Sequence, residues 1–561
     1  MASRLLLSLL AACAACAAGC ASSSSIRRFP LKEPMLADDD ERPWRSFCSP
    51  DIHDPKKLVC TPPEYVSPFV WDGVDAMGFR PVTRFLAVDP HRESVNVNAL
   101  DEVPDSSWYE NRITRHALTP EEVARGPCEP DDLAPGDADE SWVIDQGKND
   151  GANPGFRVKT DTGGRYLFKV DEEGHPERAT GAAAIATRIY HAAGYWTGCD
   201  RVVYARRGIF ELLPGLGYSD NTGIRRPFGA EQLEAMLAGA SRRGDRYRFV
   251  ASKWLEGKTL GPFTYEGVRK DDPNDVVPHE DRRELRGQRV LAAWLGHFDA
   301  REQNSMTTWL TRRPEEDDAA APGHIRHWII DLNDCFGSEW TWDQVTRRLG
   351  FSYYFDGADV LADYVTLGIP RRSWDRVRRP PDGEIFGYYE ADLFDPEAWK
   401  PGYQNPAFLR MSELDAAWMA RIIARFTPAH VAALVKVGDF TEPRHAEYLR
   451  KTLLARQRKV LRRWLAIASP LADLEVLGTS LCAVDLARRS KTWESFRYGA
   501  TALVGDGLDR SVPLVVDVRE DGRVCVPVPS DAYTVIDLTN GVAKRPLRAH
   551  VAGKKVVGIE R

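Results

Sequence analysis

Two short segments of the chain carry residue types suited to phosphoryl transfer. Asp299 is followed five residues later by Asn304, and Asp331 ends the apolar run that begins at Trp328. A carboxylate can accept the proton of an attacking hydroxyl group, and carboxylate and amide oxygens are the hard ligands that Mg2+ prefers. We therefore interpret Asp299 as the proton acceptor, and Asn304 and Asp331 as ligands of Mg2+ on a nucleotide such as ATP.

A lysine and a glycine-containing loop upstream would bind the phosphates of that nucleotide. Lys169 lies near the end of a predicted strand, from which its ammonium group would contact the α- and β-phosphates. Backbone amides between Gly151 and Gly155 would cover the phosphates, although Pro154 removes one amide donor. The body of the following helix has no acidic residue, so Glu177, just before it, is the predicted ion-pair partner of Lys169.

Each of these residues also has a purely structural explanation. Asp299 with His297 is typical of a hydrogen-bonded pair at a helix end, and Asn304 is typical of a turn. Asp334 is a second candidate for the metal ligand, and we prefer Asp331 because it ends the apolar strand. The order of all these residues on suitable predicted elements favours a nucleotide site over coincidence.

A metal hydrolase is a further alternative, because His324 and His327 lie three residues apart near Asp331. In a strand these two side chains point to opposite faces. Shared binding of one metal ion by the two histidines is therefore disfavoured.

The predicted secondary structure positions the candidate residues on two units. The first unit has strands over residues 142–145, 156–159 and 165–170 and a helix over 180–191 with Gly194 as its cap. A strand and hinge over 249–257 link it to the second unit. The second unit has a helix over 281–295, strands over 306–310 and 325–330, and mostly helical sequence over 341–468 that ends in a basic helix over 444–465. The predicted hairpin carries Asn304 at its entrance and Asp331 at its exit, which would bring the two together.

The segment from about residue 142 to residue 468 resembles the atypical kinases of the HipA-type and phosphatidylinositol-kinase-like group. In that group a catalytic-loop Asp, an Asn and a strand-end Asp have the roles given above for Asp299, Asn304 and Asp331. The resemblance implies an α+β, two-lobed protein-kinase-like fold, with the N-lobe ending at about residue 255. The metal-binding Asp of the group is usually followed by Phe-Gly, whereas Leu332 and Asn333 follow Asp331 here.

Three runs resemble more closely a bacterial family of uncharacterised lipoproteins with an atypical kinase-like core. They are Glu102 to Trp108, Glu284 to Gly287 and Ala293 to His297. No substrate is assigned to that family. This resemblance therefore implies a fold and a metal-nucleotide site without an established activity.

The first twenty residues are predicted to be a lipoprotein signal peptide. Arg4 precedes an apolar stretch over residues 5–12, and small residues precede Cys20. This resembles a lipobox, in which a lipidated Cys20 would anchor the protein in the bacterial cell envelope, at the periplasmic face of the outer membrane. The lipobox usually has Leu where this chain has Ala17, so Cys13 and an ordinary secretory signal remain as alternatives.

Length and composition predict further units around the kinase-like segment. Because 561 residues exceed one average core, we expect residues 21–65 to be a tether, 66–140 a wrapping segment, 141–468 the kinase-like domain and 471–561 a small β-sheet or sandwich domain. The β domain would bind a protein partner. A net charge of -7, spread over charges of both signs, gives no indication of nucleic-acid binding.

Seven cysteines follow Cys20 and are too scattered for a zinc site or a disulfide scaffold. Cys48 and Cys60 are close enough in sequence to bridge in an oxidising compartment. We expect the other five to be buried single thiols. After the N-terminus, no apolar run approaches the length that spans a bilayer.

Two functions follow from these observations. The first is an envelope-anchored phosphotransferase that uses Mg2+ and a nucleotide. The second is a kinase-like fold without catalysis that binds a partner, which is kept because little ATP is present outside the cytoplasm.

Overall fold

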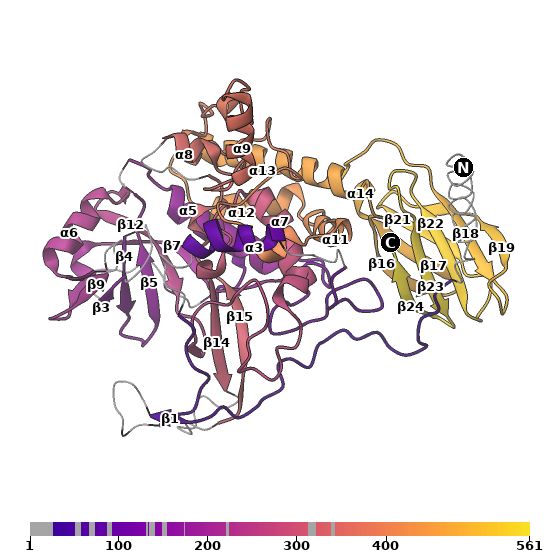
Figure 1. The fold of residues 1–561 in the computed structure, drawn as a ribbon, viewed down its shortest axis with the longest axis horizontal. Coiled ribbons are helices and arrows are strands. Elements are labelled where there is room, and N and C mark those ends of the chain that lie inside the picture. The colour runs from indigo at the N-terminus through magenta and orange to yellow at the C-terminus, as the bar shows by residue number, and fades with distance from the viewer. Residues whose placement is uncertain are drawn as a thin grey trace, which may run out of the picture.

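The computed structural model describes most of the chain and shows an α+β protein. The described residues are 26–50, 56, 58–66, 73–86, 93–130, 133, 141–148, 154–172, 174–219, 224–311, 321–337 and 343–561. Figure 1 shows a mainly β unit on the left, a helical unit in the centre and a second β unit on the right. The α+β class expected from the sequence is confirmed.

The first β unit is built on a seven-stranded sheet. Its strands are β3 (Trp142–Gly147), β4 (Gly155–Lys159), β5 (Arg165–Lys169), β7 (Asp200–Ala205), β8 (Phe210–Leu212), β11 (Arg242–Arg243) and β12 (Arg246–Lys253). The three predicted strands are the antiparallel neighbours β3, β4 and β5, and β12 pairs with β5. Phe168 lies in the core between this sheet and α6 (Ala230–Gly239). Side chains alternate along a strand, so Lys169 points to the opposite face.

A second, four-stranded sheet contains the predicted hairpin. It consists of β13 (Lys258–Thr259), β14 (Ser305–Thr311), β15 (Gly323–Ile329) and β6 (Trp196–Thr197). Ser305 of β14 pairs with Ile329 of β15, and the backbone N–H of Ile330 donates to the carbonyl of Asn304 at 3.1 Å. The hairpin therefore brings Asn304 next to Asp331, as its sequence pattern predicts.

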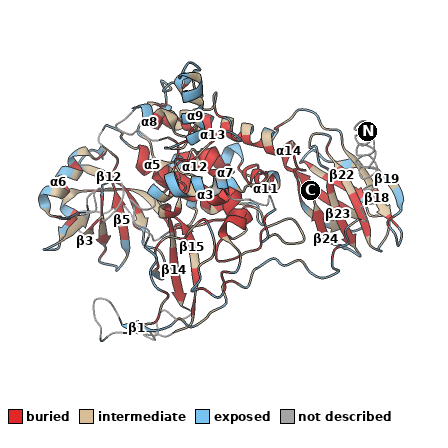
Figure 2. Cartoon of the chain, viewed as in Figure 1, coloured by how far each residue is buried: buried red, intermediate tan, exposed pale blue. Residues whose placement is uncertain are grey.

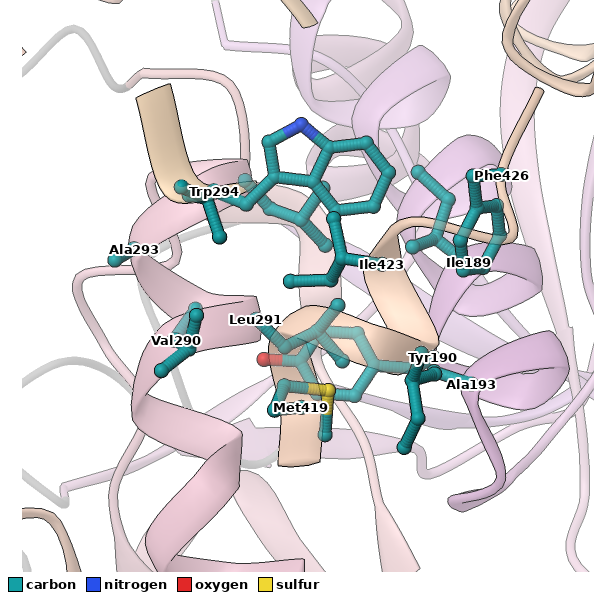
Figure 3. Packing of buried hydrophobic residues seen from close by; sticks show 14 of the residues in the cluster. Ile189, Tyr190, Ala193, Val290, Leu291, Ala293, Trp294, Met419, Ile423 and Phe426 are labelled. Atoms are coloured by element: carbon teal, nitrogen blue, oxygen red, sulfur yellow. The ribbon is translucent and has the colours of Figure 1, made fainter. Parts of the chain in front are cut away.

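The central unit is a helical core. Its main helices are α5 (Arg178–Ala193), α7 (Arg283–Leu295), α11 (Glu413–Ile423), α12 (Pro428–Val437) and α13 (Pro443–Trp464). Figure 3 shows Leu291 and Trp294 of α7 among apolar side chains of α5 and α11. Trp294 also donates its indole N–H to the carbonyl of Leu453 on α13, at 2.9 Å. The helices expected over 180–191, 281–295 and 444–465 thus join in one core.

Gly194 ends α5 as expected from the sequence. Its φ of 121° is outside the range that residues with a side chain usually adopt. A Cβ atom at this position would lie 2.3 Å from the ring of Tyr109. The glycine therefore permits both the turn and the close approach of the segment before α5.

Shorter elements connect these units. They are β1 (Ser49–Pro50), β2 (Leu58–Val59), the π-helix Asp75–Phe79, α3 (Arg80–Leu86), α4 (Pro120–Arg125), β9 (Gly217–Ser219), β10 (Arg225–Pro227), the 3-10 helices Arg207–Ile209, His279–Asp281, Glu302–Asn304, Leu332–Asp334, Ser373–Arg376 and Glu384–Phe386, and α8 (Asp343–Arg348), α9 (Gly357–Thr366), α10 (Pro406–Leu409) and α14 (Leu486–Arg489). Among the helices in the described ranges, none combines the length and the apolar character needed to cross a bilayer.

The C-terminal unit consists of two antiparallel sheets that share one core. One sheet contains β16 (Leu471–Leu477), β17 (Ser480–Asp485), β21 (Arg523–Pro527) and β20 (Asp517–Val518), and the other contains β19 (Arg510–Leu514), β18 (Gly499–Val504), β22 (Thr534–Thr539), β23 (Leu547–Ala552) and β24 (Lys555–Glu560). Leu481 and Val524 from the first sheet pack with Ile536 and Val551 from the second. The segment expected to form a small β-sheet or sandwich is thus a two-sheet unit.

The chain before residue 66 contacts the C-terminal unit, the hairpin sheet and the segment around Ser107 in its described ranges. Phe29 lies against Gly558 and His550 of the C-terminal unit, and Trp44 lies edge-on to Trp309 of β14. The carboxylate of Asp40 is buried and accepts hydrogen bonds from Ser107. The described part of the segment predicted to be a tether therefore makes specific contacts with the folded units, although other apolar side chains of it, such as Phe47, are exposed.

Three disulfides correct the expectation for the cysteines. Cys48–Cys60 is confirmed, but Cys128 bonds to Cys199 and Cys482 to Cys525, so that Cys335 is the one buried free thiol among the described residues. The partners are 71 and 43 residues apart, and only the tertiary fold brings them together. Disulfides of this kind are typical of proteins in oxidising compartments.

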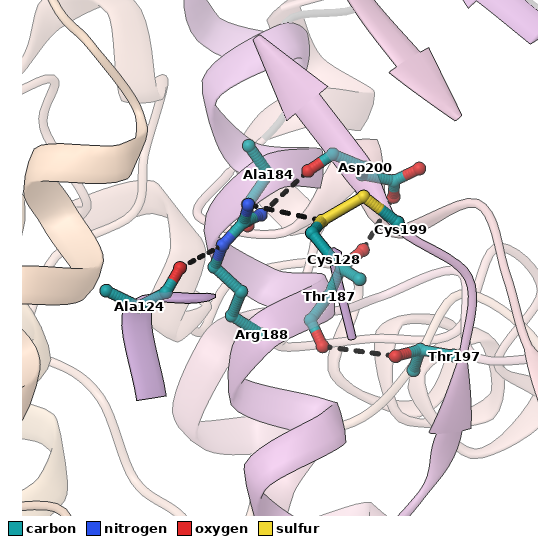
Figure 4. The surroundings of a disulfide bond; sticks show 8 residues. All are labelled: Ala124, Cys128, Ala184, Thr187, Arg188, Thr197, Cys199 and Asp200. Carbon is teal, nitrogen blue, oxygen red and sulfur yellow. Dashed lines mark hydrogen bonds between the residues drawn. A yellow bond between two sulfur atoms is a disulfide. The ribbon is translucent and has the colours of Figure 1, made fainter. Parts of the chain in front are cut away.

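The Cys128–Cys199 disulfide lies at a junction of three elements (Figure 4). The buried guanidinium of Arg188 on α5 donates to Cys128 Sγ at 3.4 Å and to the carbonyls of Ala184 and Asp200, each at 2.7 Å. It also donates to the carbonyl of Ala124 on α4. The disulfide and this arginine together hold α4, α5 and the start of β7 in place.

Replacing both Cys128 and Cys199 by serine is expected to lower the free energy of unfolding by about 2–4 kcal/mol, because the unfolded chain gains freedom when the link is lost. Urea unfolding followed by tryptophan fluorescence measures this change. The matched control replaces Cys48 and Cys60, which are 12 residues apart and should lose less. An unchanged unfolding midpoint for the Cys128 and Cys199 variant would contradict the structural role of this disulfide.

Candidate active site

An ion pair between Lys169 and Asp331 joins the first sheet to the hairpin sheet. Lys169 Nζ lies 2.7 Å from Asp331 Oδ1. Lys169 is buried at the end of β5, and Asp331 follows β15 with φ 56° and ψ 56°. A left-handed conformation is unfavourable for a residue other than glycine, and such strain is concentrated at functional sites. In this conformation the carboxylate of Asp331 lies against the lysine of the first sheet.

The two groups hold each other in their charged forms. Burial alone would raise the pKa of Asp331, but the positive charges of Lys169 and Lys148 outweigh it and hold this pKa at about 2. Burial alone would lower the pKa of Lys169, but Asp331, followed by Asp200 and Asp334, raises it above its ordinary value. Both partners are therefore charged at neutral pH.

Asp299 and Asn304 lie together in the loop after α7. The side-chain amide of Asn304 donates to Asp299 Oδ2 and to the Asp299 carbonyl, each at 2.8 Å. The amide oxygen of Asn304 is then the atom of this side chain that could bind a cation. The predicted proton acceptor and the predicted metal ligand are neighbours in the structure.

Arg301 is a site residue that the sequence analysis missed. Its Nε lies 2.9 Å from Asp299 Oδ1, and its guanidinium lies over the ring of Tyr403, 4.7 Å from the ring centre. A guanidinium beside the proton acceptor can neutralise a phosphoryl group there. Its position two residues after Asp299 was a signal available in the sequence.

Asp334, three residues after Asp331, feels the negative charges of Asp299 and Asp331. Burial first, and then the negative charges of Asp299 and Asp331, raise the pKa of Asp334 well above its usual value. The two acids between which the sequence offered a choice therefore both lie at this site. Repulsion among the three carboxylates is the electrostatic problem that a divalent cation would solve.

His297 lies behind the cluster as a neutral residue. It is fully buried, and its Nδ1 lies 2.8 Å from the hydroxyl of Tyr190. Burial lowers its pKa to about 4, although the charge of Asp331 opposes this shift. His297 therefore has a packing role here and contributes no positive charge at neutral pH.

The described residues show no metal site made by protein side chains alone. Within the described ranges, no three His, Cys, Asp or Glu side chains are grouped closely enough to hold a metal ion. Mg2+ is usually bound by one or two carboxylates and takes its other ligands from phosphates and water. Asp331 and Asp334, with the amide oxygen of Asn304, match that set of ligands.

Glu177 is not the partner of Lys169, which corrects the sequence prediction. Its carboxylate accepts hydrogen bonds from the backbone N–H of Thr441, at 2.8 Å, and from the Thr441 hydroxyl. Glu177 precedes α5 with φ 64°, and this conformation turns it toward the segment after α12. The side chain thus connects the start of α5 to the segment after α12 within the helical unit.

Asp200 takes the place predicted for Glu177 near Lys169. Lys169 and Val202 both pair with Val250, so Asp200, two residues before Val202, lies on the same face of the sheet as Lys169. Its carboxylate accepts a hydrogen bond from Thr187 of α5 at 2.6 Å. Burial raises the pKa of Asp200, while hydrogen bonds from Ser252 and Thr187 and the charge of Lys169 oppose this shift.

The remaining predicted residues have other positions. Gly155 begins β4 opposite Lys169, and a Cβ atom there would lie 2.5 Å from the carbonyl oxygen of Phe168. Gly155 therefore permits the close pairing of β4 and β5. Gly151 and Cys20 lie outside the described residues.

Two buried arginines fix the first sheet and α5 against the rest of the site. Arg178, the first residue of α5, donates to the carbonyls of Asn333 and Gly337, at 3.3 and 3.1 Å. Arg248 of β12 donates to the carbonyls of Gly438 and Asp439, at 2.6 and 2.7 Å. These bonds cross between the units, so the relative positions of Lys169 and Asp331 are strongly constrained.

His324 and His327 do not form a shared metal site. The ring of His327 is stacked on Trp108, with 3.4 Å between ring centres, and its Nδ1 lies 3.2 Å from the Ser107 hydroxyl. His324 lies on the other face of β15, where its Nε2 is 3.7 Å from Glu41. The alternation expected for a strand separates them.

A cavity of about 360 Å³ borders the site on the side of the helical unit. Gly296, Phe298 and Gly337 line it next to the Asp299 loop, and aromatic residues such as Trp374 and Tyr388 line its other walls. Asp299 itself does not line the cavity, and Phe298, its neighbour in sequence, does.

Comparisons with known proteins do not extend this description. A scan against protein-family models, a search of curated proteins and a search of solved structures each found no match.

Replacing Asp334 by asparagine is expected to raise the free energy of unfolding at pH 7 by about 0.5–2 kcal/mol, because the raised pKa means that ionised Asp334 opposes folding. In the folded protein Asp334 binds its proton more tightly than in the unfolded chain. Its contribution to stability therefore falls as the pH rises from the ordinary pKa of 3.8 to the raised value.

Thermal unfolding of the Asp334→Asn variant between pH 3.5 and pH 7 measures this effect. The gain in the free energy of unfolding relative to the wild type should be largest at pH 7 and should shrink as the pH falls toward 3.8. Asp382→Asn, at an exposed position, is the control and should change little. A loss of stability at pH 7 would show that repulsion within the carboxylate cluster is not the dominant interaction of Asp334.

Proposed function

We propose that the protein is an atypical, kinase-like phosphotransferase that uses Mg2+ and a nucleotide, with an acceptor that binds near Asp299. Asp299 accepts the proton of the acceptor hydroxyl group. Asp331, Asp334 and Asn304 hold Mg2+, and Lys169 contacts the nucleotide phosphates. Arg301 neutralises the charge on the phosphoryl group in transfer.

The observation that carries this proposal is the Lys169–Asp331 ion pair at 2.7 Å, together with Asn304 beside Asp299. These residues come from β5, the loop after α7 and the end of β15, in the order that the resemblance to atypical kinases implies. A structural pair alone would not explain the additional carboxylate of Asp334. Phosphoryl transfer explains it, because this reaction needs positioned cations and acids rather than a reactive nucleophile of the enzyme.

The charges of the site also favour a bound metal-nucleotide. Three carboxylates lie close enough to raise the pKa of Asp334, and Lys169 and Arg301 lie beside them. A divalent cation would relieve the repulsion among the carboxylates. Nucleotide phosphates would then take Lys169 and Arg301 as partners.

The proposed location is the bacterial envelope, with a lipid anchor at Cys20. Three disulfides among the described residues are consistent with an oxidising compartment. The nucleotide supply at that location is part of the proposal, and the donor is to be identified among nucleoside triphosphates by the experiment below. The aromatic cavity beside Phe298 is the proposed place for the acceptor.

Mg2+ with the correct nucleoside triphosphate is expected to stabilise the protein, by about 2.7 kcal/mol at a ligand concentration of 100 times Kd. Thermal unfolding with each of the four nucleotides, with and without Mg2+, measures this change. The shift should be lost in Asp331→Ala and kept in the exposed control Asp382→Ala. A wild-type protein that shows no shift with any nucleotide would refute the proposal.

A second candidate function is a binding module that has the same fold without catalysis. It is favoured by one observation: both carboxylate oxygens of Asp299 are already engaged, one by Asn304 and one by Arg301. In this alternative the site is a structural ion-pair network, and a partner binds elsewhere, for example on the two-sheet C-terminal unit.

Replacing Asp299 by asparagine separates the two functions. The phosphotransferase loses the proton acceptor, so its turnover should fall by about 100-fold or more while nucleotide binding persists. If the protein is a phosphotransferase, the cellular phenotype of the Asp299→Asn variant should match that of a deletion. A phenotype equal to wild type, at an equal protein level, would favour the binding module.

A further inference from the structure

Helix α9 and the turn after it expose many large apolar side chains. Tyr364 is 81% exposed, Leu367 84% and Ile369 80%, and the same surface includes Val360, Leu361 and Val365; we call these six residues the α9 tip. This described helix contains no buried residue. Figure 2 shows its exposed surface at the upper edge of the molecule. Contiguous apolar patches of this kind mark interaction sites in soluble proteins.

The sequence of α9 puts its apolar and acidic residues on different faces. Val360, Leu361, Tyr364 and Val365 follow the spacing of one helix face, whereas Asp363 lies on the opposite side. Arg372 donates to Asp363 Oδ1 at 3.0 Å and to Asp359 Oδ1 at 3.3 Å. Arg372 therefore pairs with both of these acids, and the apolar face points outward.

A basic segment borders the α9 tip. Residues 370–380 contain five arginines and one acid, Asp375, whose carboxylate accepts a hydrogen bond from the backbone N–H of Arg372. Arg371, Arg376 and Arg378 are exposed. The surface around the apolar tip thus has a positive charge.

We propose that the α9 tip docks on a lipid bilayer that contains anionic headgroups. An exposed apolar helix face beside arginines is the pattern of helices that lie in the membrane interface, because apolar side chains enter the acyl boundary and cations attract lipid phosphates. The tip projects from the helical unit at the top of Figure 1. A projecting, positively bordered apolar helix fits a flat anionic surface. This inference does not depend on the proposed phosphotransferase activity.

A fluorescent probe at Tyr364 tests the docking directly. The full-length Tyr364→Cys variant is labelled with an environment-sensitive dye and mixed with vesicles of phosphatidylcholine alone or with 30% phosphatidylglycerol. Because the dye reports only its own surroundings, the result is independent of any attachment by the N-terminus. The free thiol Cys335 is buried, and the unsubstituted chain measures its background labelling.

The matched control is Val515→Cys, at an 83% exposed position of the C-terminal unit. We expect a blue shift and quenching by lipid-bound quenchers for the dye at 364, with phosphatidylglycerol only, and no change for the dye at 515. Replacing Arg371, Arg376 and Arg378 by glutamate should reduce the lipid affinity at least tenfold. No shift at 364, or an equal shift at both positions, overturns the proposal. A shift that depends on protein concentration without lipid also overturns it and identifies a second copy as the partner.

Discussion

The ion pair between Lys169 and Asp331 is the interaction on which the rest of the site depends. A charge taken out of water must be paired, and these two residues come from two different sheets. The alternation of β5 sets the direction of Lys169, and the left-handed backbone at Asp331 sets that of its partner. Because removal of one partner would leave the other buried and unpaired, the pair constrains how the two units are placed.

The surrounding contacts hold Lys169 and Asp331 in place. They do not remove the repulsion between the carboxylates of the site. Arg178 and Arg248 donate to backbone carbonyls across the units and thereby fix α5 and the sheet. Asp334 lies beside Asp299 and Asp331 with a raised pKa. A bound cation would provide the missing charge, so this repulsion agrees with the proposed metal-nucleotide site. The proposal itself rests on the Lys169–Asp331 ion pair and on Asn304 beside Asp299.

Local patterns in the sequence predicted the elements that carry the site, and tertiary topology decided the rest. The strand spacing around Lys169 and the turn signal at Gly194 depend on residues close in sequence, and both predictions agree with the structure. Asp200 reaches Lys169 only because β7 pairs with β12, a pairing with no local signal. The lack of a local signal also explains why Glu177 was wrongly predicted as the ion-pair partner of Lys169.

The disulfides and the α9 tip also show that local sequence patterns do not reveal tertiary contacts. Cys128 and Cys199 are separated by 71 residues, so their bond follows from the packing of α4 on α5 and not from spacing. In α9 the apolar pattern is that of a helix packed against a core, yet Tyr364 is exposed. Periodicity predicts which face of a helix is apolar, but it does not predict what covers that face.

A crystal structure of the protein with Mg2+ and a non-hydrolysable nucleoside triphosphate analogue tests the central claim most directly. The account predicts Mg2+ at about 2.1 Å from a carboxylate oxygen of Asp331, and Lys169 Nζ within hydrogen-bond distance of a phosphate oxygen. A nucleotide bound away from these residues, with the Lys169–Asp331 pair still closed and no cation between Asp331 and Asp334, would contradict it.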